Sequence, residues 1–301
     1  MDTLDQERNR TADKPLVSVV IPVYNRAHCV EKAMQSVLDQ TYSNLELIMV
    51  DDGSKDASAQ VIKSVGDPRV KYIYQENAGA CAARNRGVAY ARGEYIAFHD
   101  SDDTWHETKL EKQMNAMTEH GADVVICKQV HIQGERVVQL TPKRIGQRFV
   151  SLQDDIFGIG TQTILTRKSV LLDEPFDGDM PRLQDFEWLY RVLHQYKVFC
   201  IDEGLVDYIV GDDSITRSHE KRYIAMKLFI EKHPEVKKEL PFLSMHFVKD
   251  LIESTLEVRK TDRKDSRKYL RLARAYFPGI FRFARAAVQQ KRRNAGSKGG
   301  S

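Results

Sequence analysis

The chain has 301 residues, with 46 Lys or Arg against 43 Asp or Glu and a formal net charge of +3. Hydrophobic residues make up 42% and aromatic residues 9%, which is enough for a sizeable core and excludes a globally disordered protein. No apolar run approaches the roughly 18 residues that span a bilayer, so no transmembrane helix is expected.

The charge is unevenly distributed. Residues 258–301 carry 14 Lys or Arg and 2 Asp or Glu, a balance of +12, which leaves −9 for residues 1–257. A basic tail on an acidic body favours a polyanionic surface as the partner of the tail.

The N-terminus and the cysteines indicate the compartment. Residues 1–14 are polar and lack an apolar signal region, so we expect a flexible leader and no secretory signal. The cysteines at 29, 81, 127 and 200 form no CxxC pair. This spacing favours reduced thiols in a cytoplasmic protein over a disulfide framework or a zinc site.

Strand and helix patterns alternate in the first hundred residues. Strands are predicted at 17–22, 45–50, 70–74 and 94–98, and helices at 27–39, 55–65 and 79–91. The alternation predicts an α/β fold with a parallel sheet, helices on both faces, and ligands beyond the C-terminal strand ends.

The alternation is less regular after residue 105. The predicted elements are helices at 106–119, 184–196, 219–232 and 241–259, strands at 123–130, 197–201 and 204–210, and a polar stretch at 131–150. We divide the chain into a leader (1–14), two halves of one domain (15–105 and 106–217) and a helical C-terminal extension (218–301).

Three carboxylates follow the fourth strand, in Asp100-Ser101-Asp102-Asp103. Carboxylates this close repel one another, which favours a bound cation, and oxygen ligands suit Mg²⁺ or Mn²⁺. A helix N-cap explains the same residues equally well.

Two further segments repeat the pattern more weakly. Asp51-Asp52-Gly53-Ser54 follows the second strand, where a carboxylate can bind a ribose hydroxyl or a base N–H, although Asp-Gly is also ordinary turn chemistry. Arg84 and Arg86 lie in an Ala-rich helix, and Arg matches phosphate geometry, although each taken singly is more often a solvated side chain. No GxGxxG follows the first strand, so a dinucleotide site lacks its motif.

Asp185 opens a predicted helix. One acid at a helix start is ordinarily a cap, and Asp185 and Glu187 face different sides of the helix. Asp185 becomes a candidate general base if the fold brings it to the acidic cluster.

Taken in order, these segments resemble the glycosyltransferase family 2 pattern on a GT-A fold. The resemblance covers about 16–216, through Val17–Asn25, Val50–Ser54, Asn77–Gly79 with Ala83–Asn85, Asp100–Asp103 and Gln184–Glu187.

This resemblance implies a mostly parallel GT-A sheet flanked by helices, with the basic helical extension added. It implies an inverting, metal-dependent, hexosyltransferase-type enzyme that moves a sugar from a nucleoside-diphosphate sugar, with UDP as the expected nucleotide, to an acceptor hydroxyl. The acceptor would be a saccharide or a lipid-linked saccharide in cell-surface polysaccharide or glycolipid synthesis.

The resemblance also implies the site residues. The donor-binding residues would be Pro22, Tyr24, Asp51, Asp52, Arg84, Asp100 and Asp102. Asp102 and Asp100 would hold Mn²⁺ or Mg²⁺, and Asp185 would be the catalytic base.

Three positions depart from the family pattern. Gln184 replaces the acid that commonly precedes the base, and Ile209 and Gly211 stand where the family often has Arg and His. His99 replaces an apolar residue, and we expect it to pack. These departures keep open a catalytically silent sugar-binding protein; a nucleotidyltransferase is a further alternative.

Basic and bulky apolar residues alternate at helical spacing over 262–293. This pattern suits an amphipathic segment on an anionic membrane, and it suits equally a helix pair packed on the body with Arg outside. The resulting expectation is a cytoplasmic protein, or one peripheral on the cytoplasmic membrane face. No nucleic-acid module accompanies the charge, so no nucleic-acid partner is expected.

Overall fold

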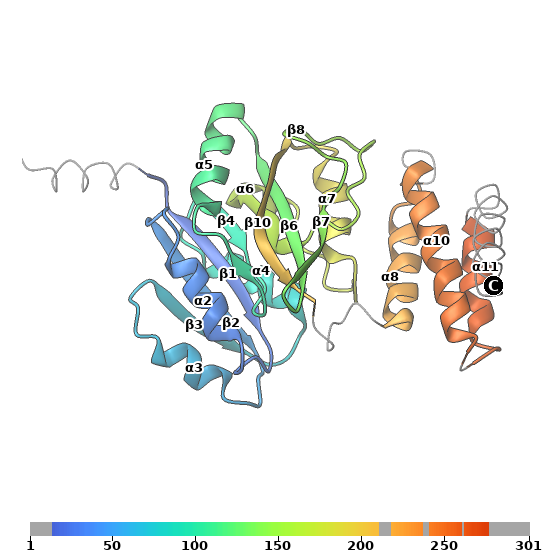
Figure 1. Ribbon diagram of the computed structural model, residues 1–301, viewed down its shortest axis with the longest axis horizontal. Coiled ribbons are helices and arrows are strands. Elements are labelled where there is room, and N and C mark those ends of the chain that lie inside the picture. The colour runs from blue at the N-terminus through green and yellow to red at the C-terminus, as the bar shows by residue number, and fades with distance from the viewer. Residues whose placement is uncertain (1–13, 211–217, 237–240, 261, 277–301) are drawn as a thin grey trace, which may run out of the picture. The chain divides into compact units, whose positions relative to one another are not determined.

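The computed structural model describes residues 14–210, 218–236, 241–260 and 262–276 (Figure 1). The chain divides into an N-terminal unit, 1–179 with 184–214, and a C-terminal unit, 180–183 with 215–301. The predicted boundary at 217/218 lies at the edge of residues outside the described ranges. That boundary, like the predicted divisions at 14/15 and 105/106, stays a prediction.

The N-terminal unit is built on one large mixed sheet. Its strands are β1 (Val17–Val23), β2 (Leu45–Asp52), β3 (Val70–Gln75), β4 (Tyr95–Phe98), β5 (Thr104–Trp105), β6 (Val124–Gln133), β7 (Arg136–Thr141), β8 (Arg148–Phe149), β9 (Ile164–Arg167) and β10 (Val198–Ile209). The sheet order is β3-β2-β1-β4-β9-β6-β10-β5, with β7 on β6 and β8 on β10. β1 to β4 are parallel, β9 is antiparallel to its neighbours β4 and β6, and β6 and β10 again run with β1. The C-terminal ends of six strands therefore share one edge, hereafter the site edge.

Helices cover both faces of this sheet. They are α2 (Val30–Leu38), α3 (Ser58–Ser64), α4 (Ala80–Tyr90), α5 (Lys109–His120), α6 (Lys168–Asp173) and α7 (Gln184–Val192), with a short 3₁₀ turn η1 (Thr161–Thr163). The main apolar core joins α2, α3 and α5 to the alternate residues of β1 and β2 that point to that face. The predicted α/β fold, a mostly parallel sheet with helices on both faces, is confirmed.

The Ala-rich composition of α4 follows from its close approach to the opposite face. A Cβ on Gly87 would clash with the side chain of Val20 in β1. Small residues therefore let α4 lie directly over β1 and β2, which α4 contacts along its length. This packing fixes the position of Arg84, three residues earlier.

The predicted elements differ from the structure mainly between 131 and 210. The stretch predicted as polar loop contains β7, and β9 and α6 were not predicted. The two strands predicted at 197–201 and 204–210 are one strand, β10, with an irregular register around Gly204. β9 and α6 follow one another without a turn residue between them, which hides both from pattern reading.

The C-terminal unit contains three described helices, α8 (His219–Lys232), α10 (Pro241–Val258) and α11 (Ser266–Tyr276). Tyr269, Leu272 and Ala273 of α11 are buried, whereas Arg267 and Arg271 are exposed. The apolar side of α11 thus packs within the C-terminal unit, where α11 contacts α10. Packing of the basic tail on the acidic body stays a prediction. Residues 277–293 of the predicted membrane segment lie outside the described ranges, and membrane docking by 262–293 stays a prediction. No helix in the described ranges combines the length and apolar content needed to cross a membrane.

Candidate functional site

The loops after β1 and β2 are joined to each other at the site edge. Asn25 adopts a left-handed φ of 53°, its backbone N–H donates to Ser54 Oγ at 3.0 Å, and its Oδ1 accepts from the Lys55 N–H at 2.8 Å. Pro22 lies near the end of β1, opposite Val50 of β2, and Tyr24 directly follows the strand with its side chain 43% exposed. The turn therefore presents an open aromatic ring at the predicted nucleoside position.

The Asp51 and Asp52 carboxylates are buried and hold neighbouring loops. Asp51 accepts from the Ser54 N–H at 2.8 Å and from the Tyr72 hydroxyl at 2.7 Å. Asp52 accepts from the backbone N–H groups of Ala78 at 2.8 Å and Gly79 at 2.9 Å. Both carboxylates thus organise the loop ends, and their predicted contact with a donor stays a prediction.

The turn after β2 requires glycine at position 53. Its φ is +79°, and a Cβ there would lie 2.9 Å from the backbone nitrogen of Asn77. A side chain would therefore separate the loop after β2 from the loop that leads into α4.

Arg84 connects α4, the end of β4 and the start of α7. Its Nη2 donates to Asp100 Oδ1 at 2.9 Å, and its Nη1 donates to Gln184 Oε1 at 3.1 Å. The guanidinium is buried, and its Nε has no hydrogen-bond partner among the described residues. Arg86, by contrast, is exposed and lies over the ring of Tyr90, as expected of a solvated side chain.

Asp185 lies within electrostatic range of this ion pair. Burial raises the pKa of Asp185, and the negative charge of Asp100 adds to the rise, while the Phe186 N–H and the positive charge of Arg84 oppose it. Its Oδ1 accepts from the Phe186 N–H at 2.8 Å. The fold thus brings Asp185 to the acidic cluster, the condition for reading it as a base.

Asp102 and Asp103 occupy different environments. The Asp102 side chain is 51% exposed, and its Oδ2 lies 3.5 Å from Arg26 Nε. Partial burial and the neighbouring Asp100 raise the pKa of Asp102. Asp103 is buried and turned inward, because it accepts from Gln162 Nε2 at 3.1 Å and from the Ile209 N–H at 2.9 Å. Burial raises its pKa well above the ordinary range.

The carboxylates partly fit a metal ion. Among the residues that the structure describes, no group of three or more His, Cys, Asp or Glu is arranged to hold one unaided. The Asp102 side chain is nevertheless solvent-exposed, and it lies close enough to Asp100 for the negative charge of Asp100 to raise its pKa. Mg²⁺ and similar ions bind commonly through one or two carboxylates plus substrate phosphates, so this pair suits a cation that arrives with a diphosphate.

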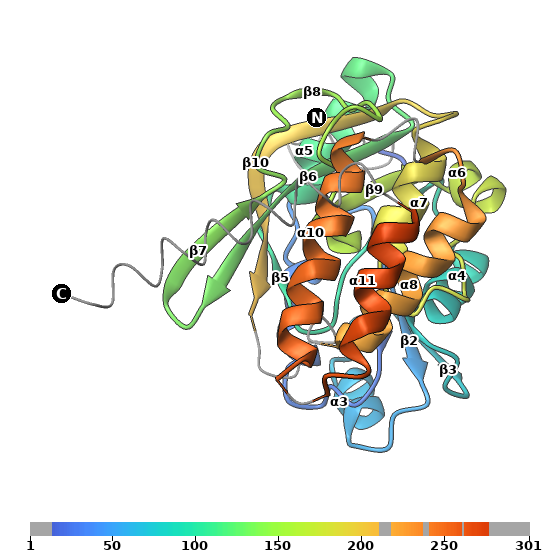
Figure 2. The same ribbon diagram turned by 90° about the vertical axis from the view of Figure 1, so that its right-hand side faces the viewer.

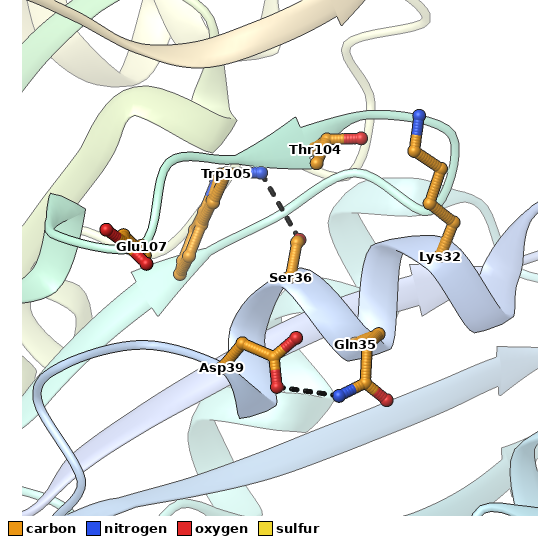
Figure 3. A pocket seen from close by; sticks show the side chains of 7 residues that line it. All are labelled: Lys32, Gln35, Ser36, Asp39, Thr104, Trp105 and Glu107. Atoms are coloured by element: carbon orange, nitrogen blue, oxygen red, sulfur yellow. Dashed lines mark hydrogen bonds between the residues drawn. The ribbon is translucent and has the colours of Figure 1, made fainter.

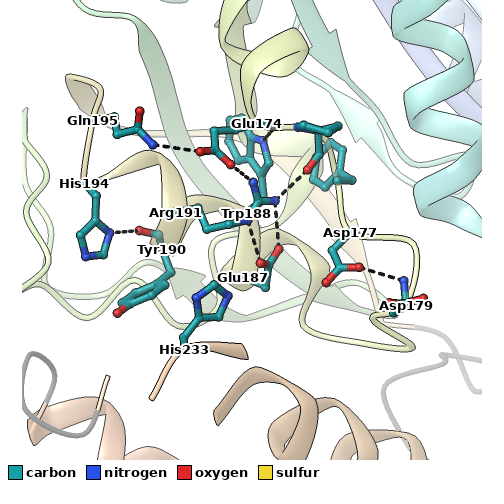
Figure 4. Close-up of polar contacts among 12 residues, drawn as sticks. Glu174, Asp177, Asp179, Glu187, Trp188, Tyr190, Arg191, His194, Gln195 and His233 are labelled. Atoms are coloured by element: carbon teal, nitrogen blue, oxygen red, sulfur yellow. Dashed lines mark hydrogen bonds and ion pairs between the residues drawn. The ribbon is translucent and has the colours of Figure 1, made fainter. Parts of the chain in front are cut away.

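A network of ion pairs and hydrogen bonds joins α7 to the segment around Glu174 (Figure 4). Arg191 binds both oxygens of the buried Glu187 at 2.7 and 3.1 Å and also pairs with Glu174. The Trp188 indole N–H donates to the backbone oxygen of Glu174 at 2.7 Å. The Asn85 side chain then clamps the backbone of Phe176 through two hydrogen bonds. The first turn of α7 is therefore fixed relative to α4 and Arg84.

Sequence reasoning missed Arg26 and the inward role of Asp103. Arg26 directly follows the matched turn, so its position at a strand end was the available signal. His99 is fully buried with its ring 4.6 Å from that of Trp105, which confirms that it packs. Ile209 supplies a backbone N–H to the site, and Gly211 lies outside the described residues.

A surface hollow lies between α2 and the segment that follows Asp103. Its volume is about 340 Å³, and its lining is Lys32, Gln35, Ser36, Asp39, Thr104, Trp105 and Glu107 (Figure 3). None of the predicted site residues lines it, so the carboxylates of the site edge remain the candidate.

Comparison with known proteins agrees with this geometry. The family model described as Glycosyl transferase family 2 matches residues 18–193, more than half of the chain. The Escherichia coli protein named UDP-Glc:alpha-D-GlcNAc-diphosphoundecaprenol beta-1,3-glucosyltransferase WfgD is 31% identical over 214 residues, 69% of this chain and 83% of that protein. The Bacillus subtilis putative teichuronic acid biosynthesis glycosyltransferase TuaG is 45% identical over 109 residues, 35% and 43% of the two chains.

Solved structures confirm the fold. Staphylococcus aureus TarS 1–349 in complex with UDP-GlcNAc has a TM-score of 0.64 at 18% identity, with 91% of this chain and 92% of that chain covered. The same protein in complex with UDP has a TM-score of 0.61 at 19% identity, with 91% of each chain covered. At this identity the likeness shows the fold alone, and it confirms the expected GT-A architecture.

Proposed function

We propose that this chain, which belongs to glycosyltransferase family 2, transfers a sugar from a UDP-sugar to a hydroxyl of a saccharide or lipid-linked acceptor, with inversion, in cell-surface glycan synthesis. The observation that carries the proposal is Asp185, held with a raised pKa within range of the Arg84–Asp100 pair. The similarity to WfgD, a glucosyltransferase named for a diphosphoundecaprenol acceptor, and to TarS, solved with UDP and with UDP-GlcNAc, supports the donor and acceptor classes.

Asp185 serves as the general base in this proposal. It takes the proton of the acceptor hydroxyl, whose oxygen bonds to the anomeric carbon while the bond from that carbon to the diphosphate breaks with its electron pair. A raised pKa brings the carboxylate closer to the working pH and makes it a stronger base. A retaining double displacement needs a second carboxylate as nucleophile. In this proposal Asp100 and Asp102 hold the metal ion instead, so a single displacement with inversion uses the carboxylates as assigned.

The donor contacts follow from the remaining strand ends. Tyr24, Asp51 and Asp52 flank the nucleoside, and the unpartnered Nε of buried Arg84 offers an N–H to the diphosphate side. Asp102 and Asp100 would hold Mn²⁺ or Mg²⁺, which neutralises charge on the departing diphosphate when bound.

The base assignment is tested with D185N and its matched control D179N, an exposed carboxylate six residues earlier. D185N should lower kcat for transfer by about 10²–10⁴-fold, the usual contribution of a general base, with UDP affinity unchanged. Full activity of D185N would show that another group takes the proton.

The metal assignment is tested with D102A by calorimetry of UDP binding with and without Mn²⁺. The variant should lose the Mn²⁺-dependent part of the affinity. Metal-dependent binding equal to that of the unsubstituted protein would remove Asp102 from the site.

The same assays separate the alternatives. A silent sugar-binding protein would bind UDP-sugars without releasing UDP, and a nucleotidyltransferase would release pyrophosphate. A panel of nucleotide sugars in Mn²⁺, read by thermal stabilisation and then by UDP release, identifies the donor.

A further inference from the structure

Exposed aliphatic side chains gather where β6, β7 and β10 end. We define the hairpin patch as Val137, Val138, Leu140 and Ile209, whose side chains are 67%, 53%, 39% and 40% exposed. Figure 2 shows the β6–β7 hairpin projecting from the sheet. Ordinary surfaces scatter such residues singly, and a gathering of them marks an interaction site.

Strand register places most of the hairpin patch on one face. Ile132 of β6 lies opposite both Val137 of β7 and Ile209 of β10, and Val130 lies opposite Leu140. Residues two apart in a strand point to the same side, so Val137, Leu140 and Ile209 share a face. A register shift leaves Val138 as the extra residue of a bulge.

The surroundings of the hairpin patch are basic, although the body of the chain is acidic. Arg136, Lys143 and Arg144 are exposed and lie in or next to β7 in sequence. The acidic residues are Glu135 at the turn and Asp207 of β10, which lies opposite Val130 and contacts His106 Nε2 at 3.0 Å. Within the part of the chain that the structure describes, none of the three basic side chains forms an ion pair with a carboxylate. Aliphatic residues bordered by unpaired Lys and Arg match the interface of an anionic bilayer.

The hairpin patch is continuous with the candidate site. The backbone N–H of Ile209 donates to Asp103 at 2.9 Å, one residue from Asp102. At the base of the hairpin, Thr141 Oγ1 lies 3.0 Å from His131 Nε2. A surface that receives the hairpin patch therefore lies next to the site edge.

We propose that the hairpin patch rests in the headgroup region of an anionic membrane and holds the site edge toward it. The basic side chains of Arg136, Lys143 and Arg144 complement anionic headgroups, and a few aliphatic side chains suffice for shallow insertion. A stable protein interface buries about 800 Å² per partner, which is more than four side chains supply. The hairpin patch shares no residue with the segment 262–293, so the two membrane predictions are tested independently.

Placement is tested by tryptophan fluorescence with V138W and its control L172W, since Leu172 on α6 is also exposed, at 66%. The native Trp105 and Trp188 are buried and give a constant background. The full-length variants are mixed with phosphatidylcholine–phosphatidylglycerol vesicles that carry brominated acyl chains. V138W should be quenched and blue-shifted, and L172W should not. Equal quenching of the two, or none in V138W, would overturn the proposal, whatever the tail does.

Affinity is tested by vesicle sedimentation of V137E/V138E against L172E. The partition coefficient of V137E/V138E should be at least about tenfold lower, because two branched side chains that enter the bilayer are replaced by charges. L172E should bind vesicles like the unsubstituted protein. R136A/K143A/R144A should lose binding mainly at low salt. Equal partitioning of the two Glu variants, or self-association without vesicle binding, would contradict a membrane partner. Because no transfer is measured, failure here leaves the proposed function standing.

Discussion

At the residue scale, the chemistry of the site depends on what stands beside Asp185. Gln184 fills the position where the family pattern commonly has an acid, and its Oε1 accepts from Arg84 Nη1. A neutral neighbour lets the Arg84 charge stabilise ionised Asp185, which opposes the rise caused by burial. The departure from the family pattern thus preserves a contact to Arg84 while it limits the rise in the pKa of Asp185.

The variant Q184E should raise the pKa of Asp185 further, because a second carboxylate lies one residue away and neutralises Arg84. The base works when ionised, so activity falls as pH drops below its pKa. The acidic limb of the pH profile of kcat should therefore move to higher pH, by about half a unit or more. The control is Q153E, an exposed position; an unshifted limb in Q184E would mean that Asp185 does not control that limb.

The sequence identified candidate site residues by their positions at strand ends. It did not predict which hydrogen bonds their carboxylates form. The fold places Asp185 within electrostatic range of Asp100, the condition under which the sequence made it a candidate base, and its role stays a prediction. Asp103, however, looked identical to its neighbours in sequence and is turned inward by Ile209, more than a hundred positions away. Such long-range contacts leave no local sequence signal.

At the element scale, α7 is held by a buried ion network rather than by a cap alone. Glu187 is 2% exposed, and Arg191 binds both of its carboxylate oxygens at 2.7 and 3.1 Å. Removing one member of a buried pair leaves an uncompensated charge, which costs more than losing a surface pair.

The variant R191A should lower the free energy of unfolding by about 3 kcal/mol and also reduce kcat, because the first turn of α7 carries Asp185. The control is K112A, which breaks the exposed pair with Glu203 and should cost less than about 1 kcal/mol. Urea unfolding at pH 7 measures both. Equal losses in the two variants would show that the network adds nothing specific.

Elements bordered by Gly, Pro or other turn-forming residues were predictable from the sequence, and elements without such borders were not. β1 ends one residue after Pro22 and β2 ends directly before Gly53, and both were predicted to within two residues at these ends. β7 contains Val137 and Val138 but is flanked by Arg, Gln and Thr, so its exposed edge reads as a polar loop. β7 therefore exposes apolar side chains to solvent, and the proposed membrane contact of the hairpin patch would cover them.

At the scale of the whole molecule, the N-terminal unit is secured at the edge opposite the site by one buried carboxylate. Glu46 of β2 is 2% exposed and joins three segments. It accepts from Ser18 Oγ at 2.6 Å, from Lys71 Nζ at 2.6 Å and from the Arg92 backbone N–H at 2.7 Å. Burial alone would raise the pKa of Glu46, but these hydrogen bonds lower it from 4.5 to about 2.

This lowered pKa makes the stability of the unit depend on pH in one direction. Glu46 has a lower pKa folded than unfolded, so its contribution is complete above about pH 4.5 and is lost as pH falls toward about 2. The variant E46Q should therefore be less stable by about 3 kcal/mol at pH 7. The deficit should shrink steadily below pH 4.5, because the protonated Glu46 of the unsubstituted protein then resembles Gln. Urea unfolding followed by circular dichroism at pH 7, 4 and 3 measures the trend, with exposed Glu119→Gln as the control. A deficit that stays constant across this range would mean that packing, rather than the charge of Glu46, secures these strands.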